Sequence, residues 1–210
     1  METETRLKSR RTIPPEVIHW FDSRGYSPFD FQKKLWKFYQ NGKSGLLYSS
    51  TGSGKTYAAM FAPVIEWLTS ETEKPGNRLE LIWITPLRAL TSDIAESIKP
   101  PLEEMGIPWK VEVRTGDTSS YKKRKQIEKL PHILITTPES LTMLLSYEKT
   151  VDNFRSLKLI VADEWHELLG TKRGVQLELA LARLKTINPK VRIWGLSATL
   201  GNPEEALKVL

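Results

Sequence analysis

Cysteine is absent from the 210-residue sequence, which excludes disulfides, thiolate metal sites and thiol nucleophiles. The 3 histidines are not paired at the spacing of metal ligands, so we predict no zinc site. No apolar run approaches the roughly 18 residues that span a bilayer, and residues 1–11 lack the apolar core of a secretory signal. These absences lead us to expect a cytoplasmic protein without a membrane partner.

The composition suits one globular domain with a sizeable buried core, because 40% of the residues are hydrophobic and 27% are charged. Lysine and arginine together number 31 against 25 aspartate and glutamate residues, which gives a formal net charge of +6. This excess favours polyanionic partners through counterion release. Many basic domains never contact nucleic acid, however, so the net charge alone does not identify the partner. The sequence motifs are needed for that.

Short apolar runs alternate along the chain with longer amphipathic stretches. The runs are nearly continuous in Ile, Leu, Val and Trp, as in strands that are buried on both faces of a parallel sheet. The predicted strands are 45–49, 79–85, 110–114, 132–136, 157–162 and 191–196. The predicted helices include 56–68, 89–105, 121–129 and 175–186. This alternation predicts an α/β domain with a mostly parallel sheet and helices on both faces.

The two ends of the sequence differ from the region between them. Residues 1–12 are polar and basic, and we expect them to be mobile, with a helix that begins near Pro14. Near the other end, Asn202 is a cap-like residue before Pro203 and a pair of glutamates, a pattern that opens a helix shortly before the sequence stops. We therefore expect one domain over residues 13–210 that belongs to a longer protein.

A phosphate-binding loop is predicted directly after the first strand. Its glycines let backbone N–H groups turn toward phosphate oxygens, and the following helix adds its positive N-terminal end. Lys55 would neutralise the β- and γ-phosphates of a nucleotide, and the Thr56 hydroxyl would bind Mg²⁺. A serine stands at the first glycine position of the general pattern, and the alternative interpretation is a chance Gly/Ser loop. The P-loop is Ser49-Ser50-Thr51-Gly52-Ser53-Gly54-Lys55-Thr56, and its residues from Ser50 onward are the candidates for binding the nucleotide.

A second, acidic motif narrows the choice among P-loop proteins, which include kinases, GTPases and transporter ATPases. The predicted strand 157–162 runs directly into Asp163 and Glu164, which places both carboxylates at the carboxyl edge of the sheet. Asp163 is suited to hold Mg²⁺ through water, and Glu164 is suited to orient and deprotonate the attacking water. An adjacent acidic pair can also be an ordinary solvated turn, but together with a P-loop it favours nucleotide hydrolysis.

Several motifs resemble those of superfamily 2 DExH-box helicases and occur in the order of that family. The stretches 163–176 and 197–205 are similar to the Lhr type (large helicase-related), especially its ligase-associated DEXH-box branch. The resemblance covers the chain from about Ile13 to its end. The matching elements are motif Ia at 85–90, a glycine-containing element (the TGD loop) at 115–117, motif Ib at 137–140, the DExH box at 163–166 and motif III at 197–199.

This resemblance implies a RecA-like ATPase domain of a DNA helicase, with ATP and Mg²⁺ as cofactors. The intact protein would move 3′ to 5′ on DNA, and DNA repair is an expectation from the branch alone. Glu164, Lys55 and Asp163 would carry the hydrolysis. His166 would connect the γ-phosphate site to motif III through hydrogen bonds, and Ser197 and Thr199 would couple the nucleotide to the grip on nucleic acid.

The stretch 25–32 is similar to the Q motif of such helicases, one residue shorter than the DEAD-box form. The Gln32 amide offers one donor and one acceptor, which match the N6 and N7 atoms of adenine. Tyr26 or Phe29 would pack on the base. The alternative is that the aromatic residues here are core residues at helical spacing, and this is the interpretation we adopt for Phe31 and Trp36.

The family likeness also places motifs Ia and Ib against a single strand of nucleic acid. Arg88, Thr115, Gly116 and Thr137 are the residues that it implies for contacts to phosphates, which carry little sequence specificity. DNA, single-stranded or duplex, is the expected partner, and RNA or an RNA–DNA hybrid is the alternative. Arg88 can also be a solvated helix residue, and the basic run 121–125 is typical of a solvated helix face.

Superfamily 2 enzymes complete the ATP site with arginines from a second RecA-like domain, which these residues lack. We therefore expect the 210 residues alone to bind nucleotide weakly, to hydrolyse it slowly and not to unwind a duplex. Two other functions stay open. A P-loop phosphotransferase would need an acceptor pocket and a lid, for which the sequence gives no signal. A nucleic-acid clamp with a decayed ATPase is disfavoured by the intact Lys55, Asp163 and Glu164.

Overall fold

The computed structural model describes residues 13–70, 78–168 and 170–198. Its core is one 6-stranded sheet in which every neighbouring pair of strands is parallel. All the predicted strands are present, most of them shorter by one or two residues at an end. The strands are β1 (Gly45–Tyr48), β2 (Leu81–Ile84), β3 (Val111–Arg114), β4 (Ile133–Thr136), β5 (Leu159–Ala162) and β6 (Arg192–Ser197).

The four predicted helices are also confirmed, and the first described helix begins at Pro15, next to the predicted position. The short helices after β4 and before and after β5, and the helix before β1, were not predicted. The expected mobile segment 1–12 and the helix expected near Asn202 lie outside the described residues. The helices are α2 (Pro15–Asp22), α3 (Asp30–Gln40), α4 (Lys55–Leu68), α5 (Arg88–Glu104), α6 (Ser120–Glu128), α7 (Pro138–Leu145), η1 (Glu148–Thr150), α8 (Val151–Phe154), α9 (Trp165–Leu168) and α10 (Lys172–Ile187).

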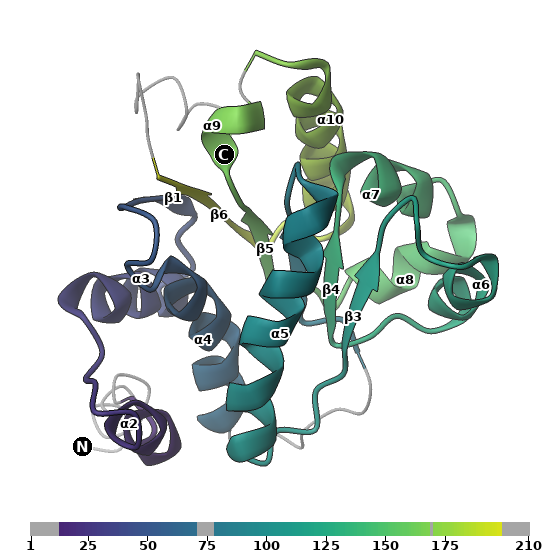
Figure 1. Ribbon diagram of the computed structural model, residues 1–210. Coiled ribbons are helices and arrows are strands. Elements are labelled where there is room, and N and C mark those ends of the chain that lie inside the picture. Colours follow the sequence, from purple (N-terminus) through teal and green to yellow (C-terminus); the bar gives the residue numbers. More distant parts are fainter. Residues whose placement is uncertain (1–12, 71–77, 169, 199–210) are drawn as a thin grey trace, which may run out of the picture.

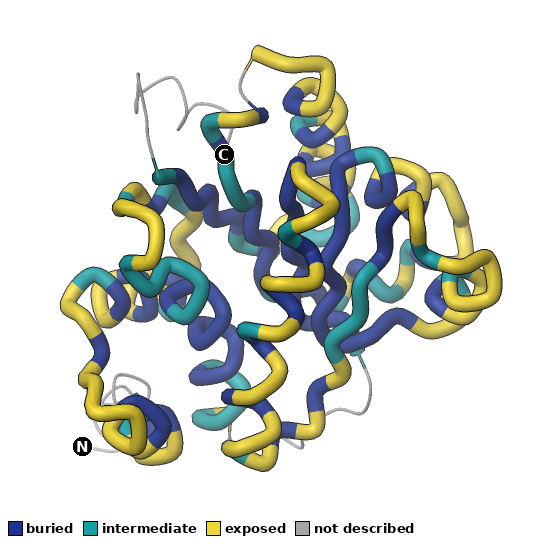
Figure 2. The backbone as a smooth tube through the Cα atoms, in the orientation of Figure 1, coloured by how far each residue is buried: buried dark blue, intermediate teal, exposed yellow. Residues whose placement is uncertain are grey.

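Helices cover both faces of the sheet, as predicted (Figure 1). Strand β2 shows why its sequence is continuously apolar. Leu81 and Trp83 face the core beneath α2 to α5, whereas Ile82 and Ile84 face the core beneath α7 to α10. None of these four side chains is exposed, and the strands form the buried centre of the tube in Figure 2. Burial of both faces therefore replaces the polar–apolar alternation of a half-exposed strand.

The strand order is β1-β6-β5-β2-β4-β3. Because the strands are parallel, the segments that follow them all emerge at one edge of the sheet. Read across this edge, the P-loop, motif III and the DExH box follow three adjacent strands, and motif Ia, motif Ib and the TGD loop follow the other three. The sheet thus separates the predicted ATP motifs from the predicted nucleic-acid motifs, and the boundary lies between β5 and β2.

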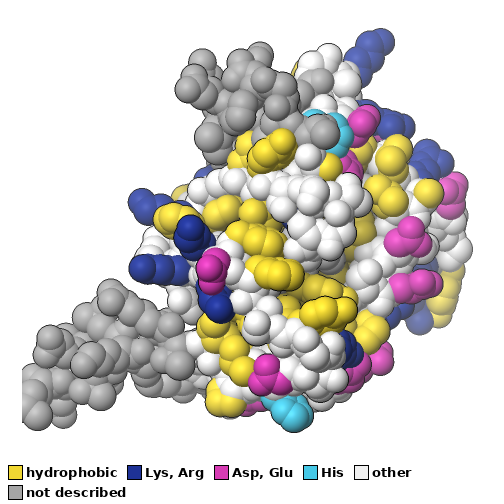
Figure 3. Space-filling view, turned by 60° about the vertical axis from the view of Figure 1, so that its left-hand side comes forward, with side chains coloured by type: hydrophobic (Ala, Val, Ile, Leu, Met, Phe, Trp, Pro, Cys, Tyr) yellow, Lys and Arg dark blue, Asp and Glu magenta, His cyan; other side chains and the backbone are white. Residues whose placement is uncertain are grey.

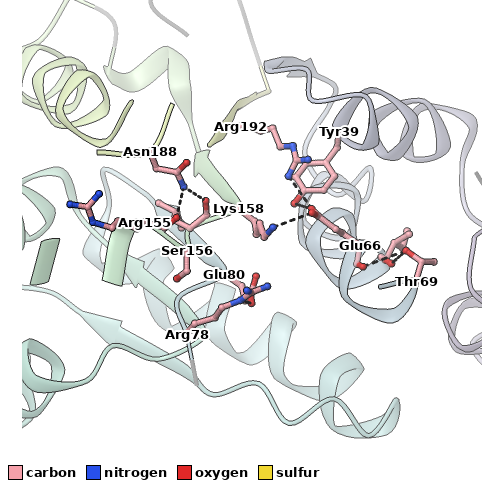
Figure 4. A network of polar contacts seen from close by, with 12 residues as sticks. Tyr39, Glu66, Thr69, Arg78, Glu80, Arg155, Ser156, Lys158, Asn188 and Arg192 are labelled. Carbon is pink, nitrogen blue, oxygen red and sulfur yellow. Dashed lines mark hydrogen bonds and ion pairs between the residues drawn. The ribbon is translucent and has the colours of Figure 1, made fainter. Parts of the chain in front are cut away.

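A polar network joins α3, α4, β6 and the residue before β5 at the opposite edge of the sheet (Figure 4). Glu66 Oε2 accepts hydrogen bonds from Tyr39 Oη at 2.6 Å and Arg192 Nη1 at 2.9 Å, and Lys158 Nζ lies 3.4 Å from Glu66 Oε1. The Arg192 guanidinium also lies 4.2 Å from the centre of the Tyr39 ring. Burial raises the pKa of Glu66, but the Tyr39 hydrogen bond and the charges of Arg192 and Lys158 outweigh it, so the pKa lies below its ordinary value.

Replacing Glu66 by glutamine is expected to lower the free energy of unfolding by about 1.5–3 kcal/mol at neutral pH, because hydrogen bonds to a charged acceptor are lost. A lowered pKa means that folding favours the ionised form, so this contribution is present above the ordinary pKa of 4.5 and is lost as the pH falls through the folded-state pKa. Denaturant unfolding of both proteins at pH 7 and at pH 3 measures it. An equal difference between them at the two pH values would contradict a role for the charge.

None of the described helices is long and apolar enough to cross a membrane.

Candidate nucleotide and nucleic-acid site

The P-loop connects β1 to α4 and turns sharply at two glycines. Gly52 and Gly54 have φ angles of 75° and 90°, in the left-handed region that a side chain disfavours. Helix α4 begins at Lys55, immediately after the second of these glycines. The Lys55 ammonium lies over the loop, where it donates to the carbonyl oxygens of Ser49 at 2.5 Å and Ser50 at 2.8 Å. The predicted strand–loop–helix arrangement is therefore present, with the lysine at its centre.

Gln32 holds the P-loop against the start of α3. Its side chain is 1% exposed, its Oε1 accepts from Phe29 N at 2.9 Å, and its Nε2 donates to the Gly54 carbonyl at 3.0 Å. A Cβ on Gly54 would lie 2.9 Å from Gln32 Nε2, so this contact needs glycine at position 54. Sequence reasoning assigned the Gln32 amide to adenine. The structure gives both of its polar groups partners within the chain, and the adenine contact stays a prediction.

The aromatic residues near Gln32 divide as expected. Trp36 is 2% exposed and belongs to the core, and Phe31 packs against that core from a partly buried position. Tyr26 and Phe29 are 66% and 56% exposed, so their rings are accessible beside the P-loop segment. On this side of the molecule, hydrophobic side chains come to the surface with several lysine and arginine side chains near them (Figure 3). Packing of Tyr26 or Phe29 on the base stays a prediction.

Asp163 lies at the end of β5, where it is held by two donors. Trp83 Nε1 donates to Asp163 Oδ2 at 3.1 Å, and the Glu164 backbone N–H donates to Oδ1 at 2.9 Å. Burial raises the pKa of Asp163, whereas these hydrogen bonds and the positive charge of Lys55 act in the opposite direction. Strand β6 alone separates β1 from β5, so the P-loop and the DExH box emerge at the same edge of the sheet. The joint binding of one nucleotide by Lys55 and Asp163 stays a prediction.

Glu164 and His166 connect the DExH box to motif III. Glu164 is the one described non-glycine residue with a positive φ, 47°, a conformation that costs about 1–2 kcal/mol and recurs at functional sites. His166 Nδ1 lies 2.9 Å from Ser197 Oγ and 3.4 Å from Glu164 Oε2. The expected contact between His166 and motif III is thus present. Thr199, the other motif III residue, lies outside the described residues.

The residues around Asp163 fit a magnesium site of the nucleotide-dependent kind. No group of three or more His, Cys, Asp or Glu side chains in the described part of the chain could hold a metal by itself. Mg²⁺ in P-loop proteins does not need one, because it keeps waters and uses phosphate oxygens with one or two protein ligands. Asp163 supplies a half-buried carboxylate that a cation would stabilise, and Thr56 lies in the first turn of α4.

The predicted nucleic-acid residues fall into an exposed pair and a buried pair. Arg88 is exposed, and its Nη1 lies 3.3 Å from Asp117 Oδ1. A Cβ on Gly116 would lie 3.0 Å from the Arg88 guanidinium, so motif Ia and the TGD loop are in close contact. Thr115 and Thr137 are buried, and their hydroxyls accept from Asp117 N at 3.3 Å and Ser140 N at 3.4 Å. The Thr115 hydroxyl thus holds the TGD loop, and the Thr137 hydroxyl caps α7. Their contacts to phosphates stay predictions.

The comparisons with known proteins agree with this geometry. A family model described as DEAD/DEAH box helicase matches residues 29–207. The chain belongs to the DEAD/DEAH box helicase family. Its matched region includes the Q-motif glutamine, the P-loop, the DExH box and motif III.

Two curated relatives of this helicase domain are Lhr-Core helicases. The ATP-dependent helicase Lhr-Core of Methanocaldococcus jannaschii is 41% identical over 206 residues, which cover 92% of this chain and 24% of that protein. Lhr-Core protein 2 of Thermococcus barophilus is 42% identical over 179 residues, covering 80% of this chain and 21% of that protein. The Lhr-type likeness is thus confirmed, and the ligase-associated branch stays a prediction. The chain spans less than a quarter of the length of these two relatives.

The helicase domain also matches a solved structure closely. The Mycobacterium smegmatis helicase Lhr, bound to single-stranded DNA and AMP-PNP, superposes with a TM-score of 0.82 at 31% identity, over 92% of this chain and 26% of that one. This match and the all-parallel sheet confirm the RecA-like fold.

Sequence reasoning missed two residues of this helicase domain that connect its motifs. Trp83 looks like any core residue of a buried strand, yet its indole N–H binds the DExH aspartate. Arg173 follows the DExH box in a charged stretch, yet it contacts both motif Ia and motif Ib. No spacing signal marks either contact, because both depend on which strands are neighbours. Trp165, which directly follows the acidic pair, is 1% exposed and belongs to the core.

Proposed function

We propose that this chain is the ATP-binding motor domain of a longer helicase, which hydrolyses ATP to move along nucleic acid and takes single-stranded DNA as its preferred track. The arrangement of motifs along one sheet edge carries this proposal. Three adjacent strands present the ATP motifs, three others present the nucleic-acid motifs, and Trp83 on β2 binds Asp163 after β5 across the boundary. This hydrogen bond therefore links the DExH aspartate to β2, the strand that runs into motif Ia.

The proposed reaction converts ATP and water to ADP and phosphate. Glu164 takes a proton from the water whose oxygen attacks the γ-phosphorus, and the bond from that phosphorus to the β–γ bridging oxygen breaks. Lys55 exchanges its two P-loop carbonyl partners for phosphate oxygens and stabilises the charge that develops on them. Mg²⁺, held by Thr56 and Asp163, would supply further positive charge at the β- and γ-phosphates.

On the nucleic-acid side, Arg88 and Gly116 are the proposed phosphate contacts. Both are exposed, and they lie side by side at the ends of β2 and β3. An exposed guanidinium next to a loop without a side chain can approach a phosphate closely and read no base. The M. smegmatis Lhr structure was solved with single-stranded DNA, which supports DNA as the ligand of this surface.

We expect the ATP turnover of the full-length protein to rise when single-stranded DNA is added, and this stimulation to weaken steeply with salt because it depends on phosphate contacts. Steady-state hydrolysis with DNA, with RNA of the same sequence and with neither measures the effect. Lys55→Ala, which removes the positive charge that stabilises the transferring phosphoryl group, serves as the background control and should abolish turnover on every track.

Three outcomes would count against parts of the proposal. If neither DNA nor RNA changed the rate of ATP hydrolysis, this result would contradict the motor function. Phosphate found on an acceptor molecule instead of in solution would indicate a phosphotransferase. If RNA or an RNA–DNA hybrid stimulated ATP turnover more strongly than DNA, the motor function would stand and the preference for DNA would be wrong.

A further inference from the structure

Arg173 connects three segments that are distant in the sequence. It lies in the first turn of α10, shortly after the DExH box. Its Nε lies 2.6 Å from Glu139 Oε1 in motif Ib, and its Nη1 donates to the Pro86 carbonyl of motif Ia at 3.2 Å. A planar guanidinium can hold two acceptors at fixed angles, which a lysine ammonium does not do. One side chain therefore spans the boundary between the ATP half and the nucleic-acid half of the sheet edge.

The turn between α9 and α10 ties Arg173 to the DExH helix. The Leu168 carbonyl, at the end of α9, accepts from Thr171 N at 3.2 Å and from Thr171 Oγ1 at 2.8 Å. The Thr171 hydroxyl in turn accepts from Gly174 N at 3.1 Å and caps α10. A Cβ on Gly174 would lie 2.0 Å from the Leu168 oxygen, so the two helices meet without free space. A displacement of α9 is consequently passed to the base of Arg173.

The charge state of Glu139 favours this link. Burial raises the pKa of Glu139, but its own backbone N–H, the Thr137 hydroxyl and the charge of Arg173 together hold the pKa below its ordinary value, which keeps the carboxylate ionised at neutral pH. The Arg173 and Glu139 side chains are 51% and 41% exposed. An ion pair this exposed contributes little to stability. Its consequence is geometric: it orients motif Ib relative to motif Ia.

We propose that Arg173 is a positioning residue that couples the DExH helix to the nucleic-acid loops, by holding Pro86 of motif Ia and Glu139 of motif Ib in one arrangement. This inference rests on the proposed function and adds a coupling element to it. The Arg88 and Arg173 side chains are similarly exposed, at 57% and 51%, but their contacts differ. Arg88 lies beside Gly116 with a long contact of 3.3 Å to Asp117, whereas Arg173 contacts both Glu139 and Pro86. Arg88 is placed to meet phosphate, whereas Arg173 is placed to hold protein groups.

The test compares Arg173→Ala, Arg173→Lys and Glu139→Gln in the full-length protein, with Lys172→Ala as the matched control. Lys172 is the neighbouring exposed cation on the same helix turn. Without DNA, we expect both Arg173 variants and Glu139→Gln to hydrolyse ATP at nearly the rate of the unsubstituted protein. With DNA, we expect their ATP turnover to be about fivefold to tenfold lower than that of the unsubstituted protein. Lys172→Ala should keep both. The double variant Arg173→Ala/Glu139→Gln should lose no more than Arg173→Ala alone, because both changes remove one interaction.

The salt dependence of DNA binding separates positioning from direct contact. The logarithm of the DNA-binding constant falls linearly with the logarithm of salt concentration. Removal of a side chain that binds a phosphate reduces the steepness of this slope by about one. We expect the slope of Arg173→Ala to equal that of the unchanged protein, and a slope lower by about one would overturn the positioning role. Full DNA stimulation in Arg173→Ala, or full rescue by Arg173→Lys, would also overturn it. If DNA did not stimulate the ATP turnover of the unsubstituted protein, this result would instead contradict the proposed function itself.

Discussion

Glu164→Gln is expected to lower the ATP turnover of the full-length protein by about 10²- to 10⁴-fold, because glutamine keeps the shape of the side chain but does not accept a proton from water. ATP binding should persist, since Lys55 and the P-loop amides do not depend on this carboxylate. The positive φ of Glu164 places its backbone in a strained conformation, which the substitution leaves in place. Single-turnover hydrolysis and equilibrium binding of ATP measure the two effects separately.

Glu167 offers a matched control for this experiment. Its Oε1 lies 3.4 Å from His166 Nε2, while Glu164 Oε2 lies 3.4 Å from Nδ1 of the same ring. The two glutamates therefore contact one histidine, but Glu167 is the more exposed and belongs to the α9 helix. We expect Glu167→Gln to retain most of the turnover. Full turnover in Glu164→Gln would contradict the role of Glu164 as general base, and equal losses in both variants would assign the effect to His166.

Gly174→Ala is expected to destabilise the domain by about 3 kcal/mol, because a well-packed site must move to admit the added methyl group. The new carbon would lie 2.0 Å from the Leu168 backbone oxygen, which has no rotamer to move away. Separation of α9 from α10 should also shift Arg173, so DNA stimulation should fall together with stability. Denaturant unfolding gives the first effect, and DNA-stimulated hydrolysis below the unfolding transition gives the second.

Gly170→Ala is a control that tests whether the destabilisation of Gly174→Ala comes from a steric clash or from backbone conformation. Gly170 has a φ of 69° and open space where a Cβ would lie, whereas Gly174 has no positive φ and no space. Alanine at position 170 should therefore cost about 1–2 kcal/mol for its left-handed backbone alone. An unfolding midpoint of Gly174→Ala at or above that of Gly170→Ala would contradict the close approach of the two helices.

Much of the fold followed from local patterns. Strands such as β2 were found because burial on both faces demands unbroken apolar residues, and α4 was found because a P-loop lysine starts a helix. Short helices such as α8 and α9, with 4 residues each, were missed because a single turn leaves no periodic pattern. The sequence located the ends of the strands only to within a few residues, because a strand ends where its pairing with neighbouring strands ends. That pairing is not visible in the sequence of one strand.

The sequence by itself determined the chemistry: a lysine and threonine in a P-loop, a carboxylate pair at a strand end, and the family to which these motifs belong. Those features are local, so neighbouring residues specify them. The tertiary structure alone decided the neighbours. The strand order sets β5 beside β2, and this adjacency brings Trp83 to Asp163 and Arg173 to Pro86 and Glu139. Contacts between segments about 80 residues apart depend on how the whole sheet assembles, and no short stretch of sequence contains that information.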